Sequence, residues 1–423
     1  MTDHSTHKRP SPKVASLVLL TCTGLTMPML LKGETSLSTV PPALQAARRH
    51  MLESPGNMLN FRSMDQLFDT RQVGRAGSVW TLPVRSSTLD FSYDSAGARI
   101  PARQFEERTF TNALLILKDG TVVYEHYLNM SNERSHFASF SMAKSIVSML
   151  VGIAVGEGRI QSLDDAVERF VPELKGSGYE GVSLRNLLRM RSGVAYDERY
   201  DFGTNSPAQQ VFEQAIVQNT HRFADLAPSL KRRMEPGRQF NYSTMDTAVL
   251  AWALERAVGQ PLATYMTTRL WEPMGMQANG FWIADGPPGS GRELAGMGFN
   301  AQARDYARLG QMMLQSGQVM GRQIVPKQWV AESTASRPID APAPGHEPPP
   351  PIPLGYGYQW WTLHGTGMYT AIGLQGQFIF VDPATRTVVV KLSFFPPDQE
   401  MKLMGECLDF FRAAAAWNPR KPE

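Results

Sequence analysis

A serine and a lysine three positions apart give the clearest chemical signal in this sequence. Ser141 and Lys144 lie where a polar turn runs into an apolar stretch at 146–154. Residues three apart on a helix share one face, so the lysine amine can reach the serine hydroxyl. A serine becomes nucleophilic when a neighbouring base takes its proton, and burial can lower the pKa of a lysine enough for that task. The spacing therefore indicates a serine hydrolase.

The same four residues would also fit a helix-capping serine followed by a solvated lysine. However, the stretch after Ser141 is apolar on nearly all sides, which is typical of a buried helix. A lysine in the first turn of such a helix is costly unless it has a partner or a chemical role. Free N–H groups and the helix dipole at this end could also stabilise an oxyanion. The context favours a nucleophile and its base.

Composition limits the remaining classes of function. The chain has 423 residues, of which 42% are hydrophobic and 19% charged, as in a globular enzyme with core for two or more domains. A net charge of +3 without a basic face argues against nucleic-acid binding. The two cysteines, Cys22 and Cys407, provide neither a disulfide framework nor a zinc site, and the eight histidines have no metal-binding spacing. We therefore expect no metal and no cofactor.

The first 35 residues have the pattern of an export signal or signal anchor. Basic residues up to Lys13 precede an apolar run at 14–31. A disordered tail with some apolar content is the alternative. No later stretch is long and apolar enough to be a second span. We expect an exported enzyme, periplasmic or tethered to the membrane, with its catalytic domain outside the cytoplasm.

Strand and helix patterns predict an α+β fold. A hairpin is expected at 113–128 around Lys118-Asp119-Gly120, and further strands at 370–383 and 385–395. Strands from both ends would build one antiparallel sheet, covered by the first and last helices, with a cleft against the helical middle. Helices are expected from Ser141 onward and over 167–172, 182–194, 243–261, 300–321 and 401–417.

Domain boundaries follow from this layout. An N-terminal extension at 36–109 would wrap on the hydrolase domain at 110–415. Within that domain the α/β part would comprise 110–160 and 295–415, and the helical part 161–294 would be inserted between them.

Five motifs follow one another between about residue 110 and residue 412. They are Ser141-Met142-Ala143-Lys144, the helix end at 188–193, Glu235-Pro236-Gly237 with the segment 240–244, the strand entry at 356–361, and Gly373-Leu374-Gln375-Gly376-Gln377. Together they resemble the class C β-lactamase and penicillin-recognising serine hydrolase superfamily, and within it most of all the 6-aminohexanoate-dimer hydrolase and esterase-like branch. The resemblance implies an α/β sandwich of the β-lactamase/transpeptidase type, and hydrolysis through an acyl-enzyme.

The resemblance also implies roles for individual residues. Ser141 would be the nucleophile, Lys144 its base, and Tyr242 the acid/base that serves the leaving group. A nearby lysine ammonium is expected to lower the pKa of Tyr242; a packed aromatic at a helix start is the alternative for this residue. The backbone N–H groups of Ser141 and Leu374 would form the oxyanion hole.

Substrate contacts are expected from Tyr196, Gly373 and Gln375, although Tyr196 could equally be a surface aromatic. The loop after Tyr196 is acidic, and a solvated loop is favoured over a site for a substrate amine. Its acidic residues are Asp197, Glu198 and Asp201.

Two departures from the family pattern bear on the substrate. Thr244 stands where the second motif usually ends in Asn, and Ala371-Ile372-Gly373 stands where true β-lactamases and peptidoglycan peptidases have K-T-G. Without that lysine, the site lacks a partner for a substrate carboxylate. This favours a small-molecule ester or linear amide. A β-lactamase or D-specific peptidase remains an alternative, as does an inactive binding protein of the same fold.

Overall fold

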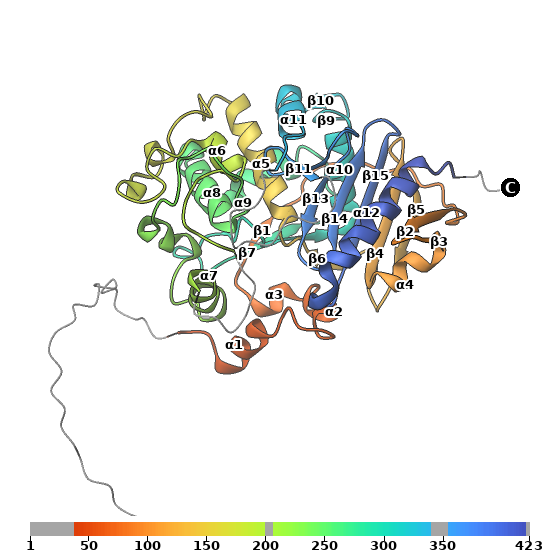
Figure 1. The fold of residues 1–423 in the computed structure, drawn as a ribbon, viewed down its shortest axis with the longest axis horizontal. Helices are drawn as coiled ribbons and strands as arrows, with labels where there is room; N and C mark the ends of the chain where they lie inside the picture. The colour runs from red at the N-terminus through yellow and green to blue at the C-terminus, as the bar shows by residue number, and fades with distance from the viewer. Residues whose placement is uncertain (1–37, 199–205, 340–353, 420–423) are drawn as a thin grey trace, which may run out of the picture. The chain divides into compact units, whose positions relative to one another are not determined.

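An antiparallel sheet forms the centre of the fold, and its strands come from two parts of the chain, residues 111–127 and 354–393 (Figure 1). The computed structural model describes residues 38–198, 206–339 and 354–419. Within them, seven strands pair in the order β11-β12-β13-β14-β15-β4-β5. These strands are β4 (Thr111–Lys118), β5 (Thr121–Tyr127), β11 (Leu354–Tyr356), β12 (Trp361–Leu363), β13 (Tyr369–Gly373), β14 (Gln377–Asp382) and β15 (Thr387–Ser393).

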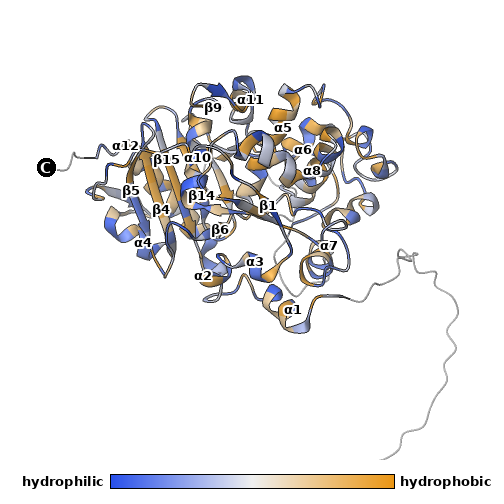
Figure 2. Ribbon diagram, turned by 180° about the vertical axis from the view of Figure 1, so that it is seen from behind, coloured by the Kyte–Doolittle hydropathy of each residue, from blue (hydrophilic) through white to orange (hydrophobic). Residues whose placement is uncertain are grey.

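Alternation along the strands gives the sheet two apolar faces. On β4, Leu115 and Leu117 join the core beneath α5 and α10, whereas Leu114 and Ile116 face the core beneath α12. Figure 2 shows β4 and β15 largely in the orange of hydrophobic residues. Since helices cover both faces, these strands have no solvent face and are apolar throughout. The predicted α/β sandwich is confirmed.

The helices surround this sheet and build the middle of the chain. Their bounds are α1 (Pro42–Arg49), α2 (Asn57–Asn60), α3 (Met64–Leu67), α4 (Phe105–Arg108), α5 (Met142–Gly156), α6 (Leu184–Leu188), α7 (Pro207–Val211), α8 (Thr244–Val258), α9 (Leu262–Met266), α10 (Ala303–Leu314), α11 (Lys327–Ser333) and α12 (Glu400–Ala416). None of the helices in the described ranges is long and apolar enough to cross a membrane. The predicted export segment lies outside those ranges.

Several predicted elements differ in detail. The predicted strand at 370–383 is a hairpin, β13 and β14, because Gln375 and Gly376 both have positive φ. The predicted helix at 182–194 shortens to α6, since Met190 has φ of 56° and its carbonyl accepts the Asn241 N–H. The predicted helix at 167–172 is instead a 3-10 turn, Val167–Arg169.

A second sheet connects the N-terminal extension to the rest of the chain. Its order is β1-β7-β8-β6, with β1 (Thr70–Val73), β7 (Gly280–Ile283), β8 (Phe299–Gln302) and β6 (His136–Ala138). β1 belongs to the extension and pairs with β7 from the middle of the chain. β6 runs directly into the turn before α5, so this sheet also supports the segment that carries Ser141. The remaining strands are β2 (Ser92–Ser95) with β3 (Ala98–Pro101), and β9 (Gln318–Val319) with β10 (Arg322–Gln323).

Candidate active site

The turn before α5 presents the hydroxyl of Ser141. Ser141 is the N-cap of α5 and stays partly exposed, while the helix it starts is buried. Phe140, just before it, has φ of 42°, in the left-handed region. The Ser139 N–H donates to the Phe299 carbonyl on β8 at 2.8 Å. The chain is therefore turned sharply and anchored before the helix begins.

Lys144 lies one turn into α5 with all three of its amine donors engaged. Its Nζ lies 2.8 Å from Ser141 Oγ, 2.9 Å from Thr244 Oγ1 and 2.9 Å from the Gly296 carbonyl oxygen. Only 1% of the residue is exposed. Burial lowers the pKa of Lys144 to about 8, while the Glu198 carboxylate acts in the opposite direction. A lysine in this state can exchange a proton with Ser141 near neutral pH.

Thr244 connects Lys144 to Glu198. The threonine hydroxyl accepts from Lys144 and donates to Glu198 Oε1 at 2.7 Å. The Thr244 N–H donates to Glu198 Oε2. Thr244 is the first residue of α8, whose N-cap is Ser243, so the carboxylate also sits at the positive end of a helix dipole. A hydroxyl can accept one hydrogen bond while it donates another, and the Thr244 hydroxyl does both here.

Tyr242 lies beside the serine and the lysine. Lys144 Nζ is 4.9 Å from the centroid of its ring, and the ring stacks on Trp361 with centroids 5.5 Å apart. Burial and the Glu198 carboxylate raise the pKa of Tyr242, while a hydrogen bond with the Ser141 side chain lowers it. The expected lowering of this pKa by the ammonium is wrong, because Lys144 faces the ring, and burial and the Glu198 charge both oppose ionisation. The phenol therefore stays protonated at neutral pH.

β13 passes close to the serine turn. A Cβ on Gly373 would come 2.1 Å from the Ser139 carbonyl oxygen, so only glycine fits at this strand end. Leu374 follows at the start of the turn to β14. The N–H groups of Ser141 and Leu374 therefore belong to two backbone segments in close contact.

Comparison with known proteins gives the family. A family model described as Beta-lactamase matches residues 99–403. The chain is 30% identical over 354 residues to the 6-aminohexanoate-dimer hydrolase of Paenarthrobacter ureafaciens, covering 82% of this chain and 88% of that protein. The chain belongs to the beta-lactamase family. It is a serine hydrolase, as its sequence predicted.

Two further proteins resemble this beta-lactamase family member. Esterase EstB of Burkholderia gladioli is 28% identical over 219 residues, covering 46% of this chain and 54% of that protein. A solved Bacillus anthracis protein, provisionally named a 6-aminohexanoate-dimer hydrolase, superposes with a TM-score of 0.73 at 23% identity, over 89% of this chain and 98% of that one. The latter likeness supports the fold.

Other residues predicted for substrate contact have different surroundings in this family member. Tyr196 is 3% exposed, which leaves little of its surface for a substrate. Gln375 is 2% exposed, and its amide bonds with Asn57 and Leu52 of the extension. Of the acidic loop, Asp197 pairs with Arg233 at 2.7 Å, and Asp201 lies outside the described residues.

Sequence reasoning missed two contacts around Lys144. The Gly296 contact uses a backbone carbonyl, which no residue type can signal. The link from Thr244 to Glu198 depends on where a loop meets a helix start. Its two residue types were visible in the sequence, but their contact was not.

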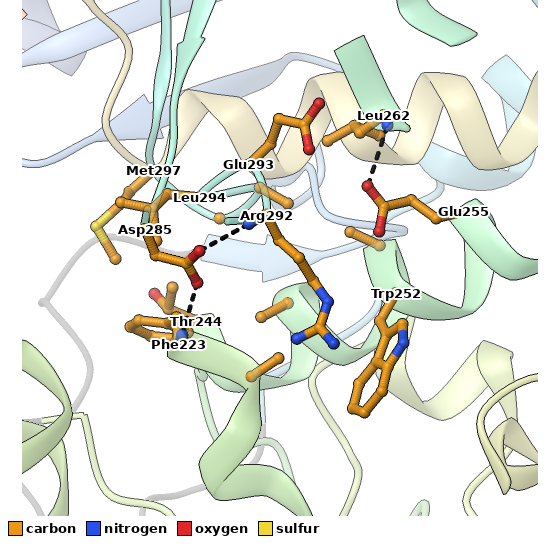
Figure 3. Close-up of a pocket in the computed structure, with 15 residues that line it drawn as sticks. Phe223, Thr244, Trp252, Glu255, Leu262, Asp285, Arg292, Glu293, Leu294 and Met297 are labelled. Atoms are coloured by element: carbon orange, nitrogen blue, oxygen red, sulfur yellow. Dashed lines mark hydrogen bonds between the residues drawn. The ribbon is translucent and has the colours of Figure 1, made fainter. Parts of the chain in front are cut away.

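A small pocket lies beside two of the groups that contact Lys144 (Figure 3). Thr244 and Gly296, which both accept from Lys144, form part of its lining. Its volume is about 20 Å³, close to the space of one water molecule. Arg292 reaches into it and lies 4.3 Å from the ring of Trp252. This pocket is too small for an acyl group.

Proposed function

We propose that this chain hydrolyses esters or linear amides through a covalent acyl-enzyme on Ser141. The observation that carries the proposal is the 2.8 Å contact between Ser141 Oγ and the buried amine of Lys144. The 30% identity to a 6-aminohexanoate-dimer hydrolase and the likeness to an esterase support this substrate class.

In the acylation step, neutral Lys144 takes the proton of Ser141. The Oγ attacks the carbonyl carbon, and the developing oxyanion accepts from the N–H groups of Ser141 and Leu374. Tyr242 donates its proton to the leaving alkoxide or amine as the carbonyl–heteroatom bond breaks. The ammonium of Lys144 then restores the phenol proton. No net proton is consumed.

In the deacylation step, a water molecule replaces the leaving group. Lys144, neutral again after acylation, removes one proton of the water as its oxygen attacks the acyl carbonyl, and the resulting ammonium supplies the proton that Ser141 regains. The serine ester bond breaks, Ser141 regains a proton, and the carboxylic acid leaves.

We place the substrate on the side of Lys144 where Ser141 and Tyr242 lie, and aromatic side chains border it. Trp361 stacks on Tyr242, while Phe240 and Tyr356 pack against Trp361 with ring centroids 6.1 and 4.9 Å away. Ala371, at the place of the K-T-G lysine, is buried and uncharged. This wall suits the apolar part of an ester or amide better than a carboxylate.

Labelling with a fluorophosphonate tests the nucleophile. We expect the probe to add covalently to the wild-type chain at Ser141, and folded Ser141→Ala to lose both labelling and turnover. Competition by esters, amides and β-lactams then ranks the substrates. Full hydrolysis by purified, folded Ser141→Ala would overturn the proposal, and absence of labelling in the wild type would support an inactive binding protein.

The substrate class is tested by assaying an ester and a β-lactam with the same enzyme preparation. We expect kcat/KM for p-nitrophenyl butyrate to exceed that for a chromogenic cephalosporin, because a cation pairing the β-lactam carboxylate typically contributes about 1.5–3 kcal/mol. A tenfold advantage for the cephalosporin would establish the β-lactamase alternative instead.

Export and a membrane tether are further parts of the proposal. They rest on the basic residues and apolar run of the first 35 residues. Fractionation of cells expressing the full chain, with N-terminal sequencing of the product, distinguishes a cleaved signal from an anchor. Recovery of the uncleaved chain from the cytoplasm would contradict both.

A further inference from the structure

We propose that residues 51–61 of the N-terminal extension position both halves of the oxyanion hole. The inference rests on the proposed function, because it assumes that the N–H groups of Ser141 and Leu374 bind the oxyanion. Each of these residues lies next to a non-glycine residue with positive φ: Phe140 at 42° before Ser141, and Gln375 at 55° after Leu374. The same short segment of the extension contacts both.

Gln375 is held by the extension through its side chain. Its Oε1 accepts from Asn57 Nδ2 at 2.7 Å, and its Nε2 donates to the Leu52 carbonyl at 2.8 Å. Asn57 Nδ2 also lies 3.2 Å from the carbonyl oxygen of Phe395, whose own N–H donates to the Gln375 carbonyl. The turn after β13 is thus bound at both its side chain and its backbone.

Asn57 is suited to this contact and to little else. It is completely buried, and within the described ranges its Oδ1 has no hydrogen-bond partner. An unpaired buried carbonyl is costly, so a site that needed only packing would favour an apolar residue. The Asn57 amide therefore serves as a hydrogen-bond donor, to Gln375 Oε1 and to the Phe395 carbonyl.

Phe140 is held by the same segment from the other side. The rings of Phe61 and Phe140 meet edge to face with centroids 4.6 Å apart. The Phe61 carbonyl accepts the Ala138 N–H at 2.8 Å, at the end of β6. Both the ring and the backbone of Phe61 therefore fix the turn that precedes Ser141.

Such support matters because positive φ is unfavourable for residues with a Cβ. It persists where surrounding contacts enforce it, and oxyanion donors must lie within about 2.7–3.1 Å of the developing charge. The segment 51–61 precedes residue 99, where the family match begins. Part of the framework of the site therefore comes from outside the matched region.

Kinetics of Asn57→Ala test the proposal in the full chain. A small misplacement of catalytic groups can cost about a hundredfold in rate. We expect kcat for p-nitrophenyl butyrate to fall about ten- to a hundredfold, with KM changed less than about twofold. A boronic acid that forms a tetrahedral adduct with Ser141 should bind correspondingly more weakly. The control is Gln66→Ala, an exposed residue of the extension outside this segment, whose amide donates to Asp65 at 3.3 Å; its kcat should match the wild type.

A second variant and a double mutant complete the test. Gln375→Met keeps the side-chain volume and removes the contact from the other partner, so it serves even if Asn57→Ala does not fold. The double variant Asn57→Ala/Gln375→Met should lose no more kcat than the worse single variant. Wild-type kcat in folded Asn57→Ala or Gln375→Met, additive losses, or a rise in KM alone would each overturn the inference. Turnover by Ser141→Ala would instead overturn the proposed function, so the two failures are distinct.

Discussion

Lys144 shows how one side chain is adjusted by its neighbours for proton transfer. Burial favours the neutral amine, whereas Glu198, reached through Thr244, favours the ammonium. Tyr242 stays protonated because the same carboxylate opposes its ionisation. A single acidic residue therefore acts on the pKa of both proposed proton carriers.

The pH dependence of turnover should report this balance. Lys144 must be neutral to accept the Ser141 proton, so kcat/KM should rise with pH through an apparent pKa of about 8. Glu198→Gln removes a charge that favours the ammonium, so this pKa should fall below that of the wild type. Asp197→Asn is the matched control, since Asp197 pairs with Arg233. If the apparent pKa on the acid side of the kcat/KM profile is the same in Glu198→Gln as in the wild type, Glu198 does not raise the pKa of Lys144.

Thr244 can be tested against the usual family residue. Thr244→Val keeps the shape but loses the hydroxyl, so Lys144 and Glu198 each lose a partner. We expect kcat to drop about ten- to a hundredfold with the fold retained. Thr244→Asn offers a carbonyl to Lys144 and an amide to Glu198 and should keep most activity. Equal loss in both variants would show that the hydroxyl is required for another reason.

At the scale of elements, two carboxylates cap one short helix. The Leu262 N–H donates to Glu255 at 3.1 Å and the Ala263 N–H to Glu293 at 2.9 Å, both at the start of α9. Burial and the neighbouring Glu293 raise the pKa of Glu255 to about 7. The pair holds a proton well above the pH at which an exposed glutamate would lose it.

This proton makes stability depend on pH. The raised pKa of Glu255 means that the folded state binds a proton that the unfolded chain releases near pH 4.5. Its stabilisation is complete below that pH and is lost as pH rises through about 7, by on the order of 1–3 kcal/mol. Glu255→Gln should flatten this decline in denaturant unfolding between pH 5 and 8, whereas exposed Glu107→Gln should not. Parallel curves for wild type and Glu255→Gln would refute the assignment.

At the scale of the whole molecule, the extension joins parts that are distant in sequence. β1 pairs with β7, and the segment 51–61 reaches the turns around Ser141 and Leu374. Arg48 on α1 is buried and donates to the Leu67 carbonyl at 2.6 Å and the Val217 carbonyl at 3.1 Å. Burial lowers the pKa of this guanidinium to about 10.

Arg48→Met should therefore destabilise the fold. The substitution leaves several buried carbonyl groups without donors, and we expect a loss of about 2–4 kcal/mol in the free energy of unfolding. Arg49→Met removes the partly exposed pair with Glu213 and an exposed 3.3 Å hydrogen bond to Gln45, and it should cost at most about 1 kcal/mol. Urea denaturation of both variants measures the difference. Equal, small effects would show that Arg48 does not hold the extension in place.

The sequence alone determined the class of chemistry and the architecture. Serine and lysine at helical spacing, the apolar helix after them, and strand patterns at both ends depend on local periodicity, which can be read directly. Only the tertiary structure decided which neighbours complete the site. Gly296 contributes a carbonyl, Glu198 arrives from a loop, and Gln375 turns away from the proposed substrate side to meet Asn57. These contacts join segments far apart along the chain, and their geometry follows from packing of the whole fold rather than from the identity of any residue.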